Sequence, residues 1–430
     1  MTLSRKLLYV VVDGMADRPL DELGGLTPLE YADTPSMDRL AKLGLTGLMY
    51  TVERGIAPES DVAVLSILGY DPHLYHTGRG VLEAVGAGLE FKDGYLALRC
   101  NFATVGGDWE LIDRRVGRSL STEEAAELGK AINEEVKLES HPADFEFKTT
   151  IGHRAVLVIK GRGIKLSSKI TNTDPAYVKV EGMGVAASKP ERRVKRCEPL
   201  VDEPEAKASA DLVNEFTEKS RRVLEKHPIN VRREAEGKLK ANVVLARDAG
   251  DRLPGLFSLE ERYGVKFSCL ADMPVEKGIA KLAGMEVVEL PPSTGRFKED
   301  YELRVEEALK ALEGHDAVYV HLKGPDEPGH DGDARRKAAA IEAVDKLFLT
   351  PLLERVSLEE ALICVTSDHA TPCSLRGHSD DPVPILIAGG DVKPDSVEKF
   401  SERECAKGGL GVLERGVELM PKLISMLRGA

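Results

Sequence analysis

The chain has 430 residues and a formal net charge of −13, and 42% of its residues are hydrophobic. This length exceeds that of one ordinary domain, so we expect two domains, and the hydrophobic fraction suffices for a normal core. The negative charge argues against nucleic acid as a partner, because binding a nucleic-acid backbone requires a cationic face. Small anionic substrates remain possible, since they need only local positive charge.

The sequence indicates neither a membrane span nor a disulfide framework. No stretch approaches the ~20 consecutive apolar residues that a membrane helix requires. The apolar run at residues 7–12 follows Arg5 and Lys6 but lacks the cleavage site of a signal peptide. The six cysteines are scattered without a Cys-x-x-Cys pair, which excludes a zinc ribbon and favours reduced thiols in a cytoplasmic protein.

The first third of the chain contains a strand and two helices of interest. Residues 7–12 predict a buried strand that ends at Asp13, and residues 36–42 predict a helix with Thr34 as N-cap and Pro35 at its first position. Residues 62–68 predict a buried helix with Ser60 near its N-terminus. Free N–H groups and the helix dipole favour negative charge there, so Ser60 is either a helix cap or a nucleophile.

The middle of the chain changes character near residue 93. The preceding glycine-rich run at residues 78–88 is not a P-loop, and its Arg79 either reaches an anion or lies in a surface turn. Strands at residues 95–104 and 153–159 and a helix at 122–137 indicate an α+β segment, and residues 204–227 predict a connecting helix. We therefore predict a discontinuous core domain of residues 1–92 and 205–430, with an inserted α+β domain of residues 93–204.

Strands alternate with helices in the last third of the chain. The predicted strands cover residues 242–246, 265–270, 285–290, 317–322, 361–365 and 384–388, and helices are expected at 304–312, 335–353 and 419–427. This alternation predicts an α/β core with a doubly wound, mostly parallel sheet and helices on both faces.

Three of the predicted strands are each followed by acidic residues. In an open parallel sheet these strand ends lie at one edge, where ligands bind. The pattern therefore predicts a metal site, although capping aspartates and surface histidines would produce the same residues. Asp326 and His330 are four residues apart, but the nearby Pro325, Pro328 and Gly329 favour a loop. The candidate ligands are Asp13, Asp326, His330, Asp368, His369 and His378.

The order of these residues resembles the alkaline phosphatase superfamily, and within it the archaeal-type 2,3-bisphosphoglycerate-independent phosphoglycerate mutases. The resemblance extends over nearly the whole chain. Its specific stretches are residues 12–19 (VDGMADRP), 23–30 (LGGLTPLE), 60–61 (SD), 68–72 (LGYDP), 78–80 (GRG), 99–102 (RCNF) and 277–280 (KGIA).

The resemblance implies an alkaline-phosphatase-like core that binds two divalent metal ions. Mn²⁺ is favoured, and Mg²⁺, Co²⁺ or Zn²⁺ are possible. One ion would be held by Asp326, His330 and His378, and the other by Asp13, Ser60, Asp368 and His369. The implied reaction is the interconversion of 3-phosphoglycerate and 2-phosphoglycerate through a phosphoserine at Ser60, without 2,3-bisphosphoglycerate.

The resemblance also implies substrate contacts and leaves alternatives open. Lys277 resembles a family lysine near the phosphoryl group, and arginines suit the glycerate carboxylate because their fork is bidentate. Each arginine could also be a solvated surface cation, and Asp248 follows Arg247 where we expect the family to carry Gly. Alternative functions are a homoserine kinase-like enzyme, a phosphopentomutase, a phosphatase, or a binding protein without turnover; the sequence does not indicate the oligomeric state. The candidate arginines are Arg79, Arg114, Arg118, Arg154 and Arg247.

Overall fold

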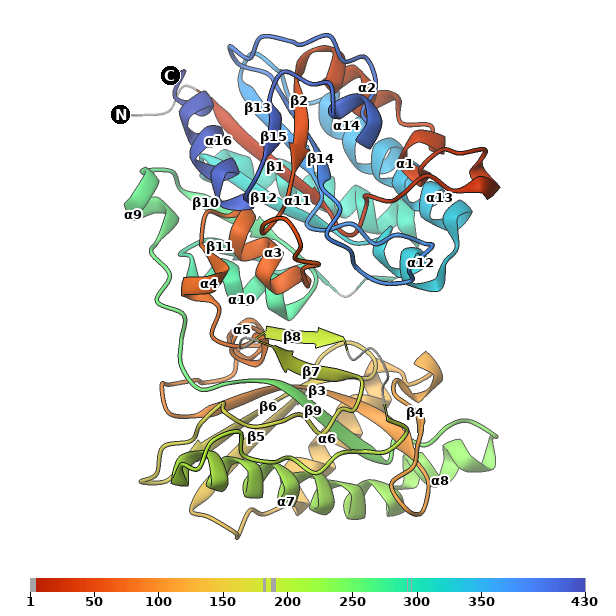
Figure 1. Ribbon diagram of the computed structural model, residues 1–430, viewed down its shortest axis with the longest axis vertical. Coiled ribbons are helices and arrows are strands. Elements are labelled where there is room, and N and C mark those ends of the chain that lie inside the picture. Colours follow the sequence, from red (N-terminus) through yellow and green to blue (C-terminus); the bar gives the residue numbers. More distant parts are fainter. Residues whose placement is uncertain (1–4, 181–182, 187–190, 292, 295, 430) are drawn as a thin grey trace. The chain divides into compact units, whose positions relative to one another are not determined.

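The computed structural model describes residues 5–180, 183–186, 191–291, 293–294 and 296–429 (Figure 1). The chain forms two compact units, of which the first comprises residues 1–75 and 256–430 and the second comprises residues 76–255. Within the described residues, no helix combines the length and the apolar character needed to cross a membrane.

The first unit is built on an eight-stranded sheet in the order β11-β10-β12-β1-β13-β14-β2-β15. Five of the strand pairs are parallel, and β14 runs antiparallel to both β13 and β2. The predicted doubly wound, mostly parallel sheet is therefore confirmed. The strands are β1 (Lys6–Val12), β2 (Gly44–Met49), β10 (Phe267–Leu270), β11 (Glu286–Val288), β12 (Ala317–Leu322), β13 (Ala361–Thr366), β14 (Val383–Ala388) and β15 (Gly411–Leu413).

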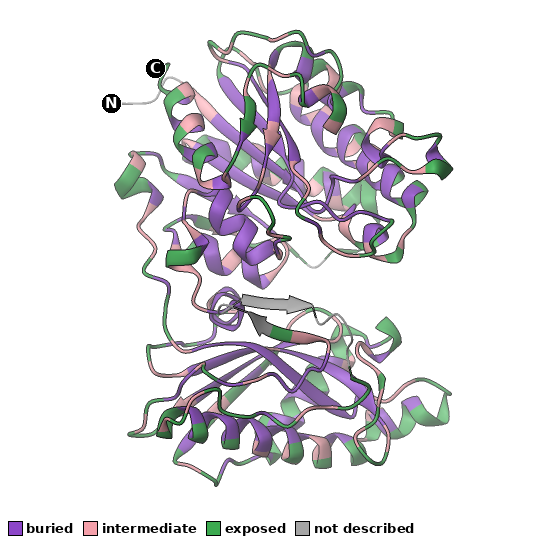
Figure 2. Ribbon diagram, viewed as in Figure 1, coloured by how far each residue is buried: buried purple, intermediate pink, exposed green. Residues whose placement is uncertain are grey.

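Helices cover both faces of this sheet, and its central strands are buried (Figures 1 and 2). On one face, alternate residues such as Leu8 and Val10 of β1 pack with α2, α11 and α13. On the other face the Tyr9 hydroxyl donates a hydrogen bond to the Ile67 carbonyl at the end of α3 (3.2 Å). The helices are α1 (Pro28–Tyr31), α2 (Pro35–Lys42), α3 (Ser60–Ile67), α4 (Pro72–Tyr75), α9 (Leu259–Tyr263), α10 (Pro274–Leu282), α11 (Phe297–Gly314), α12 (Asp326–Asp331), α13 (Ala334–Val344), α14 (Thr350–Leu353), α15 (Glu402–Cys405) and α16 (Leu419–Leu427), with short helical turns at Asp21–Leu23, Asp345–Leu349 and Gly416–Glu418.

The second unit is an α+β fold with an antiparallel sheet. The sheet has the order β4-β3-β6-β5, and β9 also pairs with β3. Its core unites the sheet with α6, α7 and α8. The elements are α5 (Arg79–Gly86), β3 (Leu96–Val105), β4 (Leu111–Asp113), a turn at Val116–Arg118, α6 (Thr122–Glu135), β5 (Ala143–Thr149), β6 (Arg154–Gly161), the hairpin of β7 (Tyr177–Val180) and β8 (Met183–Ala186), α7 (Pro204–Lys226), α8 (Pro228–Ala235) and β9 (Val243–Gly250).

The observed units differ from the predicted domain boundaries at residues 92/93 and 204/205. Strand β9 was assigned to the core sheet from its place in the strand–helix alternation, but it pairs antiparallel with β3 in the second unit. Helix α7 was interpreted as a connection, but its buried face contributes Leu212, Val213 and Phe216 to the core of the second unit. Hydrophobic periodicity identifies a strand or a helix, but it does not reveal which sheet that element joins.

Strand β2 was missed because its sequence, Gly-Leu-Thr-Gly-Leu-Met, is poor in β-branched residues. The two glycines serve close packing. A Cβ atom at Gly44 would lie 2.5 Å from the Ile387 carbonyl oxygen, and one at Gly47 would lie 2.5 Å from that of Gly411. The strand therefore fits between β14 and β15 only because these positions lack side chains.

Candidate active site

Three neighbouring parallel strands bring the predicted ligands to one edge of the first unit's sheet. Strand β1 lies between β12 and β13 and is parallel to both. Asp13 follows β1, Asp326 lies just beyond β12, and Asp368 with His369 follows β13. The structure therefore gathers side chains that are more than 300 residues apart in sequence, as the strand-end argument predicted.

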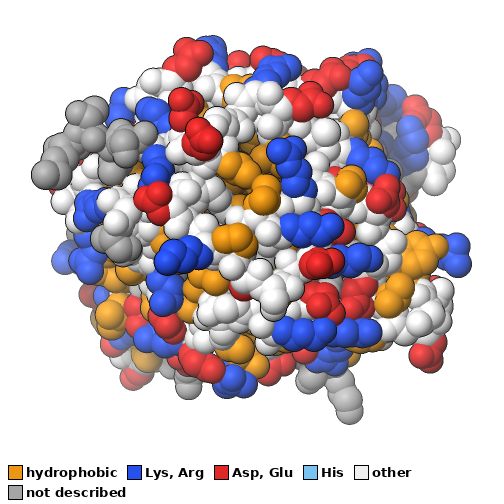
Figure 3. Space-filling model, turned by 90° about the horizontal axis from the view of Figure 1, so that it is seen from above, with side chains coloured by type: hydrophobic (Ala, Val, Ile, Leu, Met, Phe, Trp, Pro, Cys, Tyr) orange, Lys and Arg blue, Asp and Glu red, His pale blue; other side chains and the backbone are white. Residues whose placement is uncertain are grey.

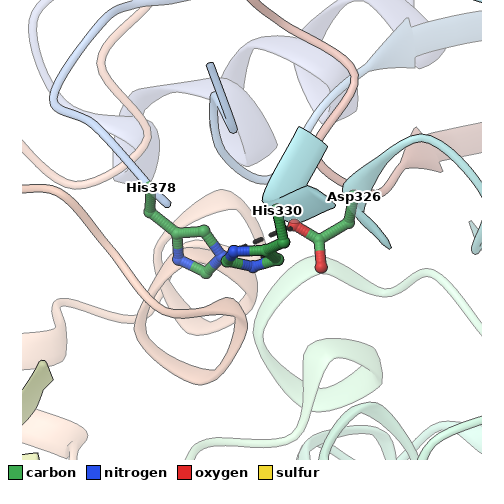
Figure 4. A group of neighbouring side chains, drawn as sticks. All are labelled: Asp326, His330 and His378. Atoms are coloured by element: carbon green, nitrogen blue, oxygen red, sulfur yellow. Dashed lines mark ion pairs between the residues drawn. The ribbon is translucent and has the colours of Figure 1, made fainter. Parts of the chain in front are cut away.

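One group of candidate ligands consists of Asp326, His330 and His378 (Figure 4). Their ligand atoms lie within 4.8 Å of one another. The Asp326 Oδ1 atom is 3.4 Å from His330 Nε2 and 3.5 Å from His378 Nε2. A carboxylate and two imidazoles at this spacing are a suitable set of ligands for a divalent metal ion.

Asp326 and His330 lie on helix α12, so the expectation of a loop was wrong. Pro325 and Pro328 are compatible with this helix because they occupy its N-cap and first turn, where backbone N–H groups have no helical acceptor. Gly329 is required by packing, since a Cβ atom there would lie 2.5 Å from the Thr371 carbonyl oxygen. The helical turn places both ligands on one face.

A second, more deeply buried group surrounds Asp13. Asp13 belongs to two overlapping sets of potential ligands. One set is Asp13, His321 and Asp368, and the other is Asp13, Asp326 and His369. The His369 Nε2 atom is 3.3 Å from both Asp13 Oδ1 and Asp368 Oδ2. Asp326 belongs to both the first and the second group. The rings of His369 and His378 are stacked with their centroids 3.9 Å apart, so the two groups are contiguous.

Two buried carboxylate oxygens in this second group are unsatisfied. Within the described residues, Asp13 Oδ1 and Asp368 Oδ2 accept no hydrogen bond. Burial raises the pKa of Asp368. The neighbouring His369 lowers this pKa, whereas the negative charge of Asp13 raises it further. Because burying carboxylates without compensation is costly, the arrangement fits a bound cation.

The hydrogen bonds of three histidines direct one ring nitrogen of each toward the carboxylates. Nδ1 of His378 lies 2.8 Å from the Pro58 carbonyl oxygen, and Nδ1 of His330 lies 3.2 Å from that of Arg376. The Thr371 hydroxyl donates to Asp326 and is therefore assigned as the acceptor for Nδ1 of His369 (3.0 Å). These partners place the proton on Nδ1, so Nε2 is free to coordinate a metal ion.

The electrostatic field around His378 also favours a cation. Burial lowers the pKa of this imidazole, but the negative charges of Glu59 and Asp326 outweigh burial and raise the pKa to about 10. In the protein without a metal ion, these negative charges stabilise an additional proton on the His378 imidazole. A divalent metal ion would experience the same attraction and compete with the proton.

Ser60 occupies the first position of helix α3, and its N-cap is Glu59. The serine is buried, and its Oγ atom is 3.3 Å from His369 Nε2. Helix α3 is buried along its whole length, so its N-terminus directs free N–H groups and the positive end of its dipole to a fixed place beside the carboxylates. This geometry suits a nucleophile whose alkoxide requires stabilisation.

Lys323, His321 and Glu276 were not identified as candidates from the sequence. The Lys323 Nζ atom is 2.7 Å from Asp13 Oδ2, 2.8 Å from Glu276 Oε1 and 3.4 Å from His321 Nε2. Burial lowers the pKa of Lys323, but Asp13 and Glu276 reverse that effect and raise it. The strand-end rule that found Asp13 also applies to Lys323, which follows β12 directly.

Lys277 is not joined to these groups by the contacts of the described residues. Its Nζ atom forms an ion pair with Glu289 (2.8 Å). Its neighbour Glu276, in the first turn of α10, is the residue that contacts the buried cluster through Lys323. The role of Lys277 near the phosphoryl group therefore stays a prediction.

The second unit brings several arginines together around buried carboxylates. Asp174 is fully buried and pairs with Arg114 (2.7 Å) and Arg247 (2.9 Å), whose guanidinium groups also lie over the Tyr177 ring. Glu83 pairs with Arg79 (2.8 Å) and with Arg99 (3.2 Å). The buried position of Arg79 contradicts its alternative interpretation as a surface residue.

Positive charge dominates this region of the second unit. Burial lowers the pKa of Arg99 to about 10, and the charges of Arg79 and Arg247 act in the same direction. Burial likewise lowers the pKa of His153 to about 3, with Arg154 and Arg115 contributing. Arg118 is exposed and Arg154 is half-buried. Burial is the main cause of both shifts, and the neighbouring arginines add to it; this repulsion between neighbouring cations favours a bound anion.

Asp248, the residue where a glycine was expected, adopts a left-handed backbone conformation with φ of 56°. Its Oδ2 atom is 3.3 Å from Arg247 Nε. Aspartate is among the residues that tolerate this conformation, so the chain keeps the turn and adds a carboxylate beside Arg247.

Comparisons with known proteins identify the family. A family model described as 2,3-bisphosphoglycerate-independent phosphoglycerate mutase matches residues 41–230. A protein with that name from Aeropyrum pernix is 45% identical over 99% of this chain and 100% of its own length. The chain belongs to the 2,3-bisphosphoglycerate-independent phosphoglycerate mutase family. The relative with the same name from Pyrococcus furiosus is 42% identical over 98% of this chain and 97% of its own length.

Solved structures agree with this family and with the fold. A Pyrococcus horikoshii protein superimposes with a TM-score of 0.80 at 34% identity, covering 100% of this chain and 99% of its own. The cofactor-independent phosphoglycerate mutase of Thermoplasma acidophilum has a TM-score of 0.63 at 31% identity, covering 98% of this chain and 100% of its own. The resemblance to the phosphoglycerate mutase family that the motifs suggested, and the predicted α/β fold class, are both confirmed.

Proposed function

We propose that this protein interconverts 3-phosphoglycerate and 2-phosphoglycerate without a bisphosphoglycerate primer. The observation that carries the proposal is the family membership: relatives named for this activity match from 95% to 99% of the chain at 41% to 45% identity. The buried Ser60 beside a carboxylate–imidazole cluster supports it, because phosphoryl transfer through an enzyme-bound intermediate needs a nucleophile in such an environment.

The clusters of the first unit are proposed to hold two divalent metal ions, with Mn²⁺ favoured. Asp326, His330 and His378 would ligate one ion, while the other would be held by Asp13, Ser60, Asp368 and His369. Ligation by oxygen and imidazole nitrogen suits Mn²⁺ or Zn²⁺. The unsatisfied carboxylate oxygens and the Nε2 atoms directed toward the carboxylates support this assignment.

Phosphoryl transfer is proposed to proceed in two steps through Ser60. When bound, the divalent ions supply charge neutralisation and lower the pKa of the serine hydroxyl. The Ser60 Oγ alkoxide, at the N-terminus of α3, attacks phosphorus, and the bond from phosphorus to the glycerate oxygen breaks. The glycerate then reorients, and its other hydroxyl attacks the phosphoserine and releases Ser60.

The arginine cluster of the second unit is proposed to bind the anionic groups of the substrate. A mutase must retain the glycerate and exclude water while the phosphoserine exists, since otherwise hydrolysis follows. Arg79, Arg114 and Arg247 are supported by their fixed positions beside buried carboxylates. Arg118, Arg154 and Lys277 stay predicted substrate contacts. A cytoplasmic location is also proposed, consistent with six cysteines that are all free and buried.

Phosphorus NMR tests the proposed reaction directly. The purified protein is mixed with 3-phosphoglycerate and Mn²⁺ in the absence of 2,3-bisphosphoglycerate, and the spectrum is repeated with excess EDTA. We expect a 2-phosphoglycerate signal that appears only without EDTA.

Other outcomes would redirect the assignment. Accumulation of inorganic phosphate would indicate a phosphatase on the same fold. Absence of any new signal in the presence of Mn²⁺ would contradict the proposal and make homoserine and pentose phosphates the next substrates to examine.

A further inference from the structure

The second unit contains a cavity of about 650 Å³ that none of the proposed active-site residues line. Part of its wall is one face of α7, from Asn214 to Lys226. Gly107 and Trp109, in the turn that joins β3 to β4, form another part, and residues 193–196 complete it. This segment is held to the turn by the Val194 N–H, which donates to the Trp109 carbonyl oxygen (3.1 Å).

The lining of this cavity is strongly basic. Its acidic side chains are Glu218 and Glu225, and its basic side chains are Arg193, Lys195, Arg196, Arg221, Arg222 and Lys226. The whole chain, in contrast, carries a net charge of −13. On the face shown in Figure 3, basic and acidic side chains are intermingled. The cavity therefore differs from the rest of this acidic protein in its excess of positive charge.

Several of these cations are not neutralised within the protein. Arg193, Arg222 and Lys226 form no ion pair with any described residue. Glu225 is engaged by Lys240 at 2.7 Å and by the Asn242 amide at 2.8 Å, so it compensates the cavity only in part. Unpaired cations in a concave surface attract a multiply charged anion.

Arg221 and Trp109 form a fixed part of the wall. The Arg221 Nη2 atom donates to the carbonyl oxygens of Gly106 (2.7 Å) and Gly107 (3.2 Å), and its Cζ atom is 4.2 Å from the centre of the Trp109 ring. Trp109 has a φ of 69°, a conformation that disfavours side chains with a Cβ atom. The indole and the guanidinium are thus held in place before any ligand arrives.

We propose that this cavity binds a chain of phosphoryl groups, as present in nucleoside triphosphates and in inorganic tripolyphosphate. Arg222 and Lys226 are separated by about one helical turn, or roughly 5–6 Å along α7, and Arg193 approaches from a different segment. This spacing suits several linked anionic groups better than one phosphate. Arginine forks bind phosphate oxygens in pairs, and the volume lies within the usual range for small-molecule sites.

Trp109 is the only tryptophan of the chain, so its fluorescence reports on this cavity alone. The full-length protein, freed of metal ions with EDTA and checked for retained fold by circular dichroism, is titrated with sodium tripolyphosphate and, separately, with ATP. Metal ions are removed so that the phosphate groups cannot bind to metal ions held by the protein. We expect a saturable change in emission, with the affinity reduced roughly ten-fold by each of Arg193→Gln, Arg222→Gln and Lys226→Gln.

Lys130→Gln provides a matched control, because Lys130 is an exposed cation on α6 of the same unit and does not line the cavity. Equal affinities for the two ligands would show that the phosphate chain is sufficient, and tighter binding of ATP would show that the nucleoside adds contacts. The proposal is overturned if neither ligand changes the emission, or if the cavity variants bind with the same affinity as Lys130→Gln.

Discussion

The two units of this protein both concentrate buried charge, but they compensate it differently. At the edge of the first unit's sheet, Asp13 and Asp368 are buried with one oxygen each that accepts no hydrogen bond from the described residues. In the second unit, the buried carboxylates of Asp174 and Glu83 are each paired with two arginines. The first region is short of cations, whereas the second contains more arginines than carboxylates.

This difference indicates which ligand each region is built to receive. Unsatisfied carboxylates with imidazole Nε2 atoms beside them favour a metal ion, because a bound cation offsets their desolvation. Arginines that are held by buried carboxylates keep their remaining N–H groups in fixed directions and favour an anion. Both features agree with the proposed reaction of a phosphorylated carboxylic acid.

Replacement of Ser60 should have the largest effect on activity. We expect Ser60→Ala to reduce kcat by about 10⁴-fold or more, since the proposed phosphoserine can no longer form. Steady-state kinetics with 3-phosphoglycerate measure this loss. Ser66→Ala is the matched control, because Ser66 lies on the same buried helix and its hydroxyl has no hydrogen-bond partner among the described residues. Comparable losses in both variants would show that the effect comes from disturbing α3.

Removal of the charge of Asp368 tests whether the carboxylates of the first unit bind a metal ion. We expect Asp368→Asn to lower the bound metal content and to reduce activity by more than about 100-fold, because it removes a proposed ligand. Elemental analysis of the purified variant is the measurement. Asp391→Asn, at an exposed ion pair with Arg5, should retain the metal. Undiminished metal content in Asp368→Asn would exclude Asp368 as a ligand.

Arg247→Lys tests the proposed role of the second unit in binding the substrate anion. Lysine keeps the charge beside Asp174 but loses the planar fork, so we expect kcat/KM to fall roughly ten- to hundred-fold, mainly through KM. The unfolding temperature should be recorded alongside, because disturbing a buried pair also affects stability. Arg162→Lys, at an exposed pair with Asp144, is the control. A wild-type KM for Arg247→Lys would remove Arg247 from the substrate site.

The smallest expected effect concerns the backbone at Asp248. Glycine adopts its left-handed conformation without the steric cost that a Cβ atom incurs, so Asp248→Gly should be more stable than Asp248→Ala by about 1 kcal/mol. Denaturant unfolding of the two variants measures the difference. Equal stabilities would mean that the turn relaxes to another conformation when the Arg247–Asp248 contact is lost.

The sequence was sufficient for the family, for the α/β class and for the predicted ligands that meet in the first unit, although not for every residue of that cluster. Asp13 directly follows one apolar strand, and Asp368 and His369 lie two and three residues beyond another. Such strands align in parallel sheets, so local pattern predicts that these residues meet. The sequence also placed Ser60 near the N-terminus of a buried helix, which is where α3 begins.

Only the tertiary structure decided which sheet each element joins and which charges are neutralised. Strand β9 and helix α7 belong to the second unit because of long-range pairing and packing that hydrophobic periodicity does not encode. His321 on β12 and Glu276 on α10 enter the buried cluster for the same reason, since the neighbours of these elements come from distant parts of the chain, whereas Lys323 follows β12 directly and could have been found from the strand-end pattern. Local patterns specify the elements, whereas burial and electrostatic compensation depend on contacts that form only when the chain is folded.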